Sequence, residues 1–269
     1  MARTQKIKER PKRKVVIIIV EGQSDENALS VALSELYEEK YGEDTIVLFA
    51  KRVNDDGTKG GDITSPRGVV PDKIEMVLNY TTIMPCITEN NLMPKYVTEI
   101  VHIIDTDGAF IPDEAVTYRE CEDEVHHHMY MDTGIFTDDV LGIIDRNHRK
   151  RDNILALLGY HKSGFPITNY YDTGHGKKTT TKPMIVPYAP CFFSCNLDHF
   201  TVADPNLESY LKILRADDFG REFGNDLESF KGFIEKDSGK VDMDYDGSWV
   251  YIQEGLNSLQ RHTNINLLF

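Results

Sequence analysis

The sequence has little of several features that would assign a protein to a class at once. Four cysteines in 269 residues are too few for the disulfide framework of a small secreted domain. No apolar run approaches the roughly 20 residues of a membrane-spanning helix, and the longest run, residues 15–20, has the length of a β-strand. No apolar segment with a small-residue cleavage site follows the charged N-terminus, as a secretory signal requires. We therefore expect a soluble cytoplasmic protein with reduced thiols that does not bind membranes.

Positive charge is scarce as well. Thirty Lys and Arg stand against 44 Asp and Glu, so the net charge is −14. This balance excludes a protein that coats nucleic acid or an anionic membrane with its whole surface, although a basic groove can exist on an acidic body. Residues 1–14 are the exception, with seven basic side chains and one glutamate. We expect a flexible basic arm there, or a tail that attracts phosphate.

The hydrophobic pattern alternates between strands and helices. The run at residues 15–20 is entirely β-branched, which is typical of a strand buried on both faces of a parallel sheet. Apolar residues then recur at helical spacing after Ser24 or Asp25, either of which can cap a helix. Strands are predicted at residues 15–20, 45–50, 99–105 and 184–188. The order of these elements predicts an α/β fold with a parallel sheet flanked by helices.

The chain divides into three predicted parts: a basic arm (1–14), an α/β domain (15–200) and a mainly helical C-terminal region (201–269). An insertion at residues 51–98 interrupts the α/β domain and contains a polar, glycine-rich loop at residues 54–68. No GxxxxGK[ST] pattern runs through this loop, so it is not a P-loop. We interpret it as a connection that can face a substrate. Helices are predicted at residues 71–80, 145–158, 207–214, 219–234 and 249–259.

Acidic residues follow the predicted strands where ligands bind in parallel α/β sheets. Glu21 follows the first strand, Asp105 and Asp107 end the third, and Asp198 follows the later strand. Residues i and i+2 at a strand end point the same way, so the two aspartates repel each other unless a cation lies between them. Oxygen ligands of this kind suit Mg²⁺ or Mn²⁺ and serve phosphoryl transfer or phosphodiester cleavage. The alternative is that each acid merely caps a turn or helix.

The segments VEGQSDENAL and IIDTDGAF together resemble the Toprim domain of topoisomerases, bacterial primases and OLD-type nucleases. The resemblance covers about residues 14–200 and implies that Glu21, Asp105 and Asp107 are catalytic metal ligands. In the OLD-type branch it further implies that Asp25 and Asp198 take part in metal binding. That branch also carries a late lysine that stabilises the transition state. The candidates for it are Lys162, Lys177, Lys178 and Lys182.

A stand-alone protein of this size most resembles the Toprim nuclease effectors of bacterial anti-phage systems such as PARIS. The resemblance implies Mg²⁺-dependent cleavage of RNA such as tRNA, or of DNA, with Mn²⁺ as a possible substitute. It also implies an ATPase partner that controls the nuclease and a homodimer when the nuclease is active. The alternative function is a Toprim-shaped binding module that docks on such an ATPase without cutting anything.

Basic residues that could contact nucleic acid lie in two segments. Arg146, Arg149, Lys150 and Arg151 form either a phosphate-contacting face or the solvated start of a helix. Lys177 and Lys178 lie in GHGKKTTTK, which is either a further contact or an exposed basic hairpin.

Three other motifs favour simpler interpretations. DTDGAF is reminiscent of dehalogenase-type phosphatases, but there the motif follows the first strand of the sheet, not the third. His126, His127 and His128 after Cys121 could suggest zinc, but consecutive histidines on an acidic helix cannot all face one ion. Cys191 and Cys195 are expected to be buried apolar side chains.

Overall fold

The computed structural model describes residues 13–120, 128–168, 170–172, 177–179, 182–224 and 226–269, with only the backbone for 170–172 and 177–179. Most of the predicted basic arm, together with Cys121, His126 and His127, lies outside these ranges. Within them, no helix combines the length and the apolar character needed to cross a membrane.

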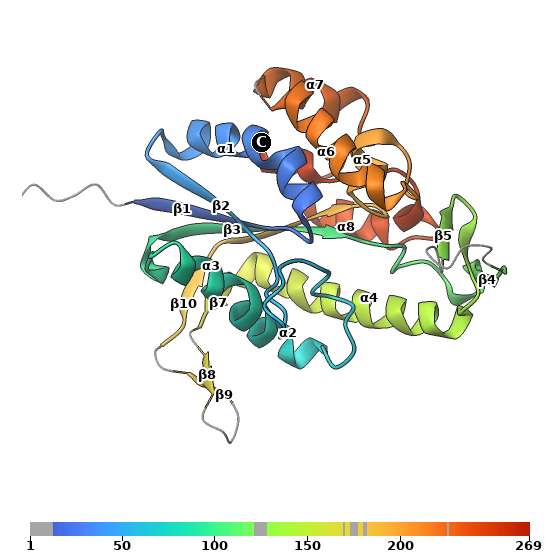
Figure 1. The fold of residues 1–269 in the computed structure, drawn as a ribbon, viewed down its shortest axis with the longest axis horizontal. Helices are drawn as coiled ribbons and strands as arrows, with labels where there is room; N and C mark the ends of the chain where they lie inside the picture. The colour runs from blue at the N-terminus through green and yellow to red at the C-terminus, as the bar shows by residue number, and fades with distance from the viewer. Residues whose placement is uncertain (1–12, 121–127, 169, 173–176, 180–181, 225) are drawn as a thin grey trace, which may run out of the picture.

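A four-stranded parallel sheet forms the centre of the protein (Figure 1). Its strands are β1 (Lys14–Ile19), β2 (Thr45–Ala50), β3 (Val97–Asp105) and β11 (Tyr188–Phe193), in the order β11-β3-β1-β2. This sheet confirms the predicted α/β class. The strand expected at residues 184–188 is wrong in its bounds, because β10 (Met184–Val186) pairs antiparallel with β7 (Phe165–Ile167). Pro187 has no N–H to continue a ladder, and it separates β10 from β11.

Helices cover both faces of the sheet, and the buried residues of β1 alternate between the two cores that these helices cover (Figure 1). Val16 and Ile18 contribute to the core under α1 (Gln23–Tyr41), α6 (Ser209–Phe223) and α7 (Leu227–Lys236). Val15 and Ile17 contribute to the core on the opposite face. There the sheet is covered by α2 (Pro71–Leu78), α4 (Val140–Ser163) and α8 (Tyr245–Ile252).

Helix α1 begins at a glycine and not at either of the two predicted capping residues. Gly22 is the N-cap, and its N–H donates to the Asp25 carboxylate at 2.5 Å. The Asp25 side chain, in the first turn of the helix, therefore accepts a hydrogen bond from the backbone N–H of the residue just before the helix. It is 6% exposed, so the same hydrogen bond fixes a buried carboxylate four residues after Glu21.

The remaining elements are short. A small sheet contains β4 (Val116–Tyr118), β6 (Gly134–Thr137) and β5 (His128–Met131), in that order. β8 (Tyr170–Asp172) pairs with β9 (Lys177–Thr179). The chain leaves α2 through a π-helical turn at Asn79–Ile83 and enters α3 (Met84–Glu89). α5 (Leu197–Val202) follows β11, and the helical C-terminal region is confirmed.

The strand order of the central sheet reverses between β1 and β3. From β1 the chain moves outward to β2 on one side, whereas β3 and β11 lie on the other side. Ligands in open parallel sheets bind where the strand order reverses, beyond the carboxyl ends of the strands. Glu21 and Asp105 lie at those two ends.

Candidate active site

Three carboxylates meet beyond the carboxyl ends of β1 and β3. Glu21, Asp62 and Asp107 each offer an oxygen within 4.8 Å of the others. Glu21 and Asp107 are two of the residues predicted from the strand ends. Asp62 comes from the glycine-rich loop, and no pattern in the sequence predicts that it reaches this point.

Asp107 holds its position through an unusual backbone conformation. Its φ is +48°, in the left-handed region, and its N–H donates to the Cys195 carbonyl at 2.8 Å. Arg146 donates to the Asp107 carbonyl at 2.8 Å, and the Tyr130 hydroxyl donates to its Oδ1 at 3.0 Å. These contacts turn the chain sharply after β3 and aim the carboxylate at the cluster.

The glycine-rich loop is tied to the cluster at consecutive residues. The Gly61 N–H donates to the Glu21 carbonyl at 2.7 Å. The N–H and hydroxyl of Thr64 both donate to Asp62 Oδ1 at 2.6 Å. Gly60 has a φ of +119°, and a Cβ there would lie 3.2 Å from the Glu21 carbonyl oxygen. Glycine at this position therefore lets the loop approach β1 closely enough to deliver Asp62.

A buried lysine lies among the three carboxylates. Lys150 is 0% exposed, and its Nζ is 2.5 Å from Asp107, 3.0 Å from Asp62 and 3.4 Å from Glu21. Lys150 is expected on a phosphate-contacting face or at the solvated start of a helix, whereas its side chain points into the protein. The spacing along α4 indicates this burial, because the buried side of the helix repeats every seven residues at Ile143, Lys150 and Leu157.

The cluster changes the protonation of its members. Burial raises the pKa of Glu21 well above its usual value; Lys150 opposes this, and the neighbouring aspartates add to it. Burial also raises the pKa of Asp105, helped by the charges of Glu21 and Asp25. Burial alone would raise the pKa of Asp62, but the charge of Lys150 and hydrogen bonds from Ser65 and Thr64 outweigh it and lower that pKa.

Asp25 and Asp198 lie next to the cluster, outside its tightest group. Burial raises the pKa of Asp25 to about 6, opposed by the Gly22 N–H and helped by the charge of Asp198. Asp198 is 5% exposed and pairs with Lys212 of α6 at 2.8 Å. The structure therefore brings the acidic residues predicted from the sequence into one region and adds Asp62.

Three other predicted basic residues have structural partners. Arg149 donates to the Ser65 carbonyl at 3.0 Å and pairs with Asp145, which ties α4 to the glycine-rich loop. Arg151 pairs with its neighbour Asp152. Lys162 pairs with Asp246 and is 74% exposed. The side chains of Lys177 and Lys178 are outside the part of the chain that the structure describes.

The donor set fits a divalent cation. Six carboxylates gather in the region, whereas the lysines paired with them are Lys150 and Lys212; the acids are Glu21, Asp25, Asp62, Asp105, Asp107 and Asp198. Among the described residues, the Asp105 carboxylate has neither a hydrogen bond nor an ion pair. Hard oxygen ligands with an excess of negative charge suit Mg²⁺ or Mn²⁺.

Comparison of the chain with protein-family models, curated proteins and solved structures gave no match.

Proposed function

We propose that this protein is a metal-dependent nuclease of the Toprim type, which hydrolyses nucleic-acid phosphodiester bonds. The observation that carries the proposal is that oxygens of Glu21, Asp62 and Asp107 lie within 4.8 Å of one another. They lie where the strand order of the parallel sheet reverses. Negatively charged phosphodiesters approach such an acidic site only when cations neutralise it, and Mg²⁺ or Mn²⁺ does so in this proposal.

The metal would be held by Glu21, Asp105 and Asp107, with Asp25 and Asp198 beside it. A bound divalent ion polarises the phosphate and lowers the pKa of a bound water. Glu21, whose own pKa burial raises, is placed to accept a proton from an attacking water. Because Lys150 contacts both Glu21 and Asp107, it positions these carboxylates and supplies positive charge beside the scissile phosphate.

The wider role rests on the resemblance to Toprim effectors. In this role the protein cleaves RNA such as tRNA, or DNA, during an anti-phage response. An ATPase partner controls the nuclease, and the active form is a homodimer. A cytoplasmic location belongs to the same proposal.

One observation favours a second function. Lys150 already places a cation among Glu21, Asp62 and Asp107, so the cluster is partly neutralised without metal. A binding module that docks on an ATPase and cuts nothing would keep the same arrangement.

Cleavage assays with total tRNA and plasmid DNA, in Mg²⁺ and then in Mn²⁺, separate the two functions. The nuclease predicts cleavage that Asp105→Asn abolishes and that EDTA stops. Asp113→Asn is the matched control, because Asp113 is exposed and pairs with His148; it should cleave like the wild type. Undiminished cleavage by Asp105→Asn contradicts the metal site. Capture of an ATPase without cleavage under any of these conditions, or with the ATPase added, favours the binding module.

A further inference from the structure

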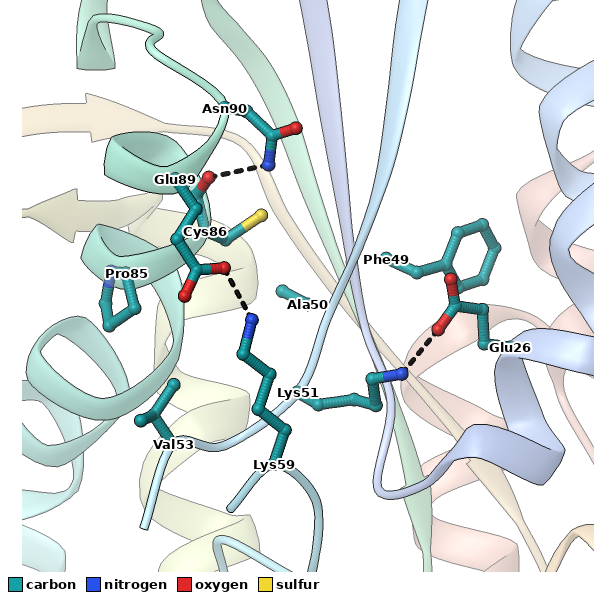
Figure 2. Close-up of a pocket in the computed structure, with 10 residues that line it drawn as sticks. All are labelled: Glu26, Phe49, Ala50, Lys51, Val53, Lys59, Pro85, Cys86, Glu89 and Asn90. Atoms are coloured by element: carbon teal, nitrogen blue, oxygen red, sulfur yellow. Dashed lines mark hydrogen bonds and ion pairs between the residues drawn. The ribbon is translucent and has the colours of Figure 1, made fainter. Parts of the chain in front are cut away.

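A cavity of about 210 Å³ lies at the carboxyl end of β2, the edge strand beside β1 (Figure 2). Its walls come from four segments that are distant in the sequence: the start of α1, the end of β2, the glycine-rich loop and α3. It is smaller than the roughly 300–1,000 Å³ of pockets for drug-sized ligands. A group about the size of one heterocyclic base is therefore the largest rigid unit that suits it.

The lining combines apolar side chains with an ion pair at each end. Phe49 and Cys86 are among the apolar residues. At one end Lys51 pairs with Glu26 at 2.5 Å, and at the other Lys59 pairs with Glu89 at 2.6 Å. Figure 2 shows both pairs, one on the α1 side and one on the α3 side.

This composition favours a nucleobase over a phosphate. Each lysine is matched by a glutamate, so the two ion pairs carry no net charge to attract an anion. Ammonium donors and carboxylate acceptors at the edge complement the acceptors and donors of a base edge. An aromatic ring such as Phe49 offers a face on which a base can stack.

A backbone hydrogen bond connects a wall of the cavity to the strand that leads to the acidic cluster. The Val20 N–H donates to the Ala50 carbonyl at 3.0 Å, so a wall of the cavity is hydrogen-bonded to the residue before Glu21. Adjacent strands are about 4.8 Å apart. Lys51 also donates to Gln23 at 2.7 Å, two residues after Glu21.

The glycine-rich loop links the two sites a second time. Lys59 lines the cavity and Asp62, three residues later, enters the acidic cluster. Between them the Gly60 N–H donates to the Arg52 carbonyl at 2.8 Å and the Gly61 N–H to Glu21. A ligand in the cavity therefore contacts the same short loop that completes the cluster.

We propose that this cavity binds the base of the nucleotide next to the phosphodiester that is cleaved. The inference rests on the proposed nuclease function and adds a subsite to it. Phe49 stacks on the base, and the ion pairs of Lys51 and Lys59 hold its edges.

The first test measures binding without cleavage. Adenosine, guanosine, cytidine and uridine are added to the protein in EDTA, and saturation-transfer NMR detects binding, with ribose as the ligand that lacks a base. At least one nucleoside should bind, and ribose should not. Phe49→Leu, which keeps apolar volume but removes the ring, should weaken binding about tenfold. Phe223→Leu is the matched control, because Phe223 is another partly buried ring that packs on the same core; it should bind like the wild type.

The second test uses cleavage of a short single strand. Phe49→Leu and Lys51→Met should raise KM about tenfold and leave kcat within about threefold. Wild-type cleavage with unchanged KM in both variants, and no nucleoside binding, overturns the subsite but leaves the nuclease standing. A third outcome is a protein that cleaves nothing but binds a nucleoside, with Phe49→Leu weakening that binding. This outcome supports a base-binding cavity and contradicts its position next to a cleaved bond.

Discussion

Replacing Lys150 by methionine tests the reasoning about the site most directly. Methionine keeps the apolar stem but removes the ammonium that contacts Glu21, Asp62 and Asp107. Removing one partner of a buried ion pair costs about 3–5 kcal/mol, because the other charge stays buried and uncompensated. The three carboxylates here are 16–24% exposed, so water relieves part of that cost. We expect Lys150→Met to lose about 3 kcal/mol of unfolding free energy at pH 7.5 in EDTA, and Tm to fall by roughly 6–12 °C.

The size of this loss should depend on pH. Lys150 lowers the pKa of both Glu21 and Asp105, against burial, so its removal raises both further. A carboxyl with a raised folded-state pKa is stabilising below its unfolded value, near 4, and that stabilisation is lost as pH rises through the folded value. The difference between the variant and the wild type should therefore be smallest near pH 4.5 and largest at pH 7.5. Urea denaturation followed by circular dichroism at the two pH values measures it.

A divalent cation should replace the missing ammonium. At a hundred times its dissociation constant, a ligand that binds only the folded state adds about 2.7 kcal/mol. Mg²⁺ should therefore raise the Tm of Lys150→Met more than that of the wild type. Lys162→Met is the control, because Lys162 lies on the same helix in an exposed pair with Asp246, and it should change stability by less than about 0.5 kcal/mol. An equal loss at both pH values would show that packing, and not charge, explains the effect, and would refute the reasoning.

Three further predictions concern residues around the site and the packing behind it. In EDTA the wild type should lose stability between pH 5 and 7.5, since the pKa of Asp25 is raised to about 6 by burial; Asp25→Asn should flatten this slope in urea titrations. Gly220→Ala should lower the unfolding free energy by about 1–3 kcal/mol, because the new Cβ would lie 2.3 Å from the Asn27 carbonyl of α1. Gly232→Ala in α7 places its Cβ where no atom lies within 4 Å. It should raise the unfolding free energy by about 0.5–1 kcal/mol in the same assay. Tyr130→Phe removes the hydroxyl that donates to Asp107 and should lower kcat of cleavage about tenfold while unfolding free energy falls by about 1 kcal/mol; an unchanged kcat would remove Tyr130 from the site.

The sheet and its acidic strand ends could be predicted from sequence because each depends on a local pattern. The β-branched run before Glu21 and the apolar run before Asp105 mark buried strands, and the end of a strand fixes where the next residue lies. The boundary at Pro187 was harder, because two short strands on either side of a proline look like one apolar segment.

The position of Asp62 could not be predicted in the same way. It lies in a loop without hydrophobic periodicity. Its place depends on the hydrogen bond from Gly61 to Glu21 and on its own ion pair with Lys150, which join distant parts of the chain. Lys150 is an intermediate case. Its spacing on α4 marks a buried position, but a buried lysine is rare unless it is paired, and the pairing partners become visible only in three dimensions.

The ion pairs and hydrogen bonds of the cluster leave some of its carboxylate oxygens without a partner. Lys150 contacts Asp62 Oδ2 and Asp107 Oδ2, whereas the remaining Oδ1 atoms accept from Thr64 and Tyr130. In the described part of the chain, Glu21 Oε2 and the Asp105 carboxylate have no such partner. A cation can therefore be held by Glu21 and Asp105 while Lys150 stays in place. On this argument Asp62 acts mainly through the lysine, and the two acids at the ends of β1 and β3 supply, beside Asp107, the oxygens without partners that a metal needs.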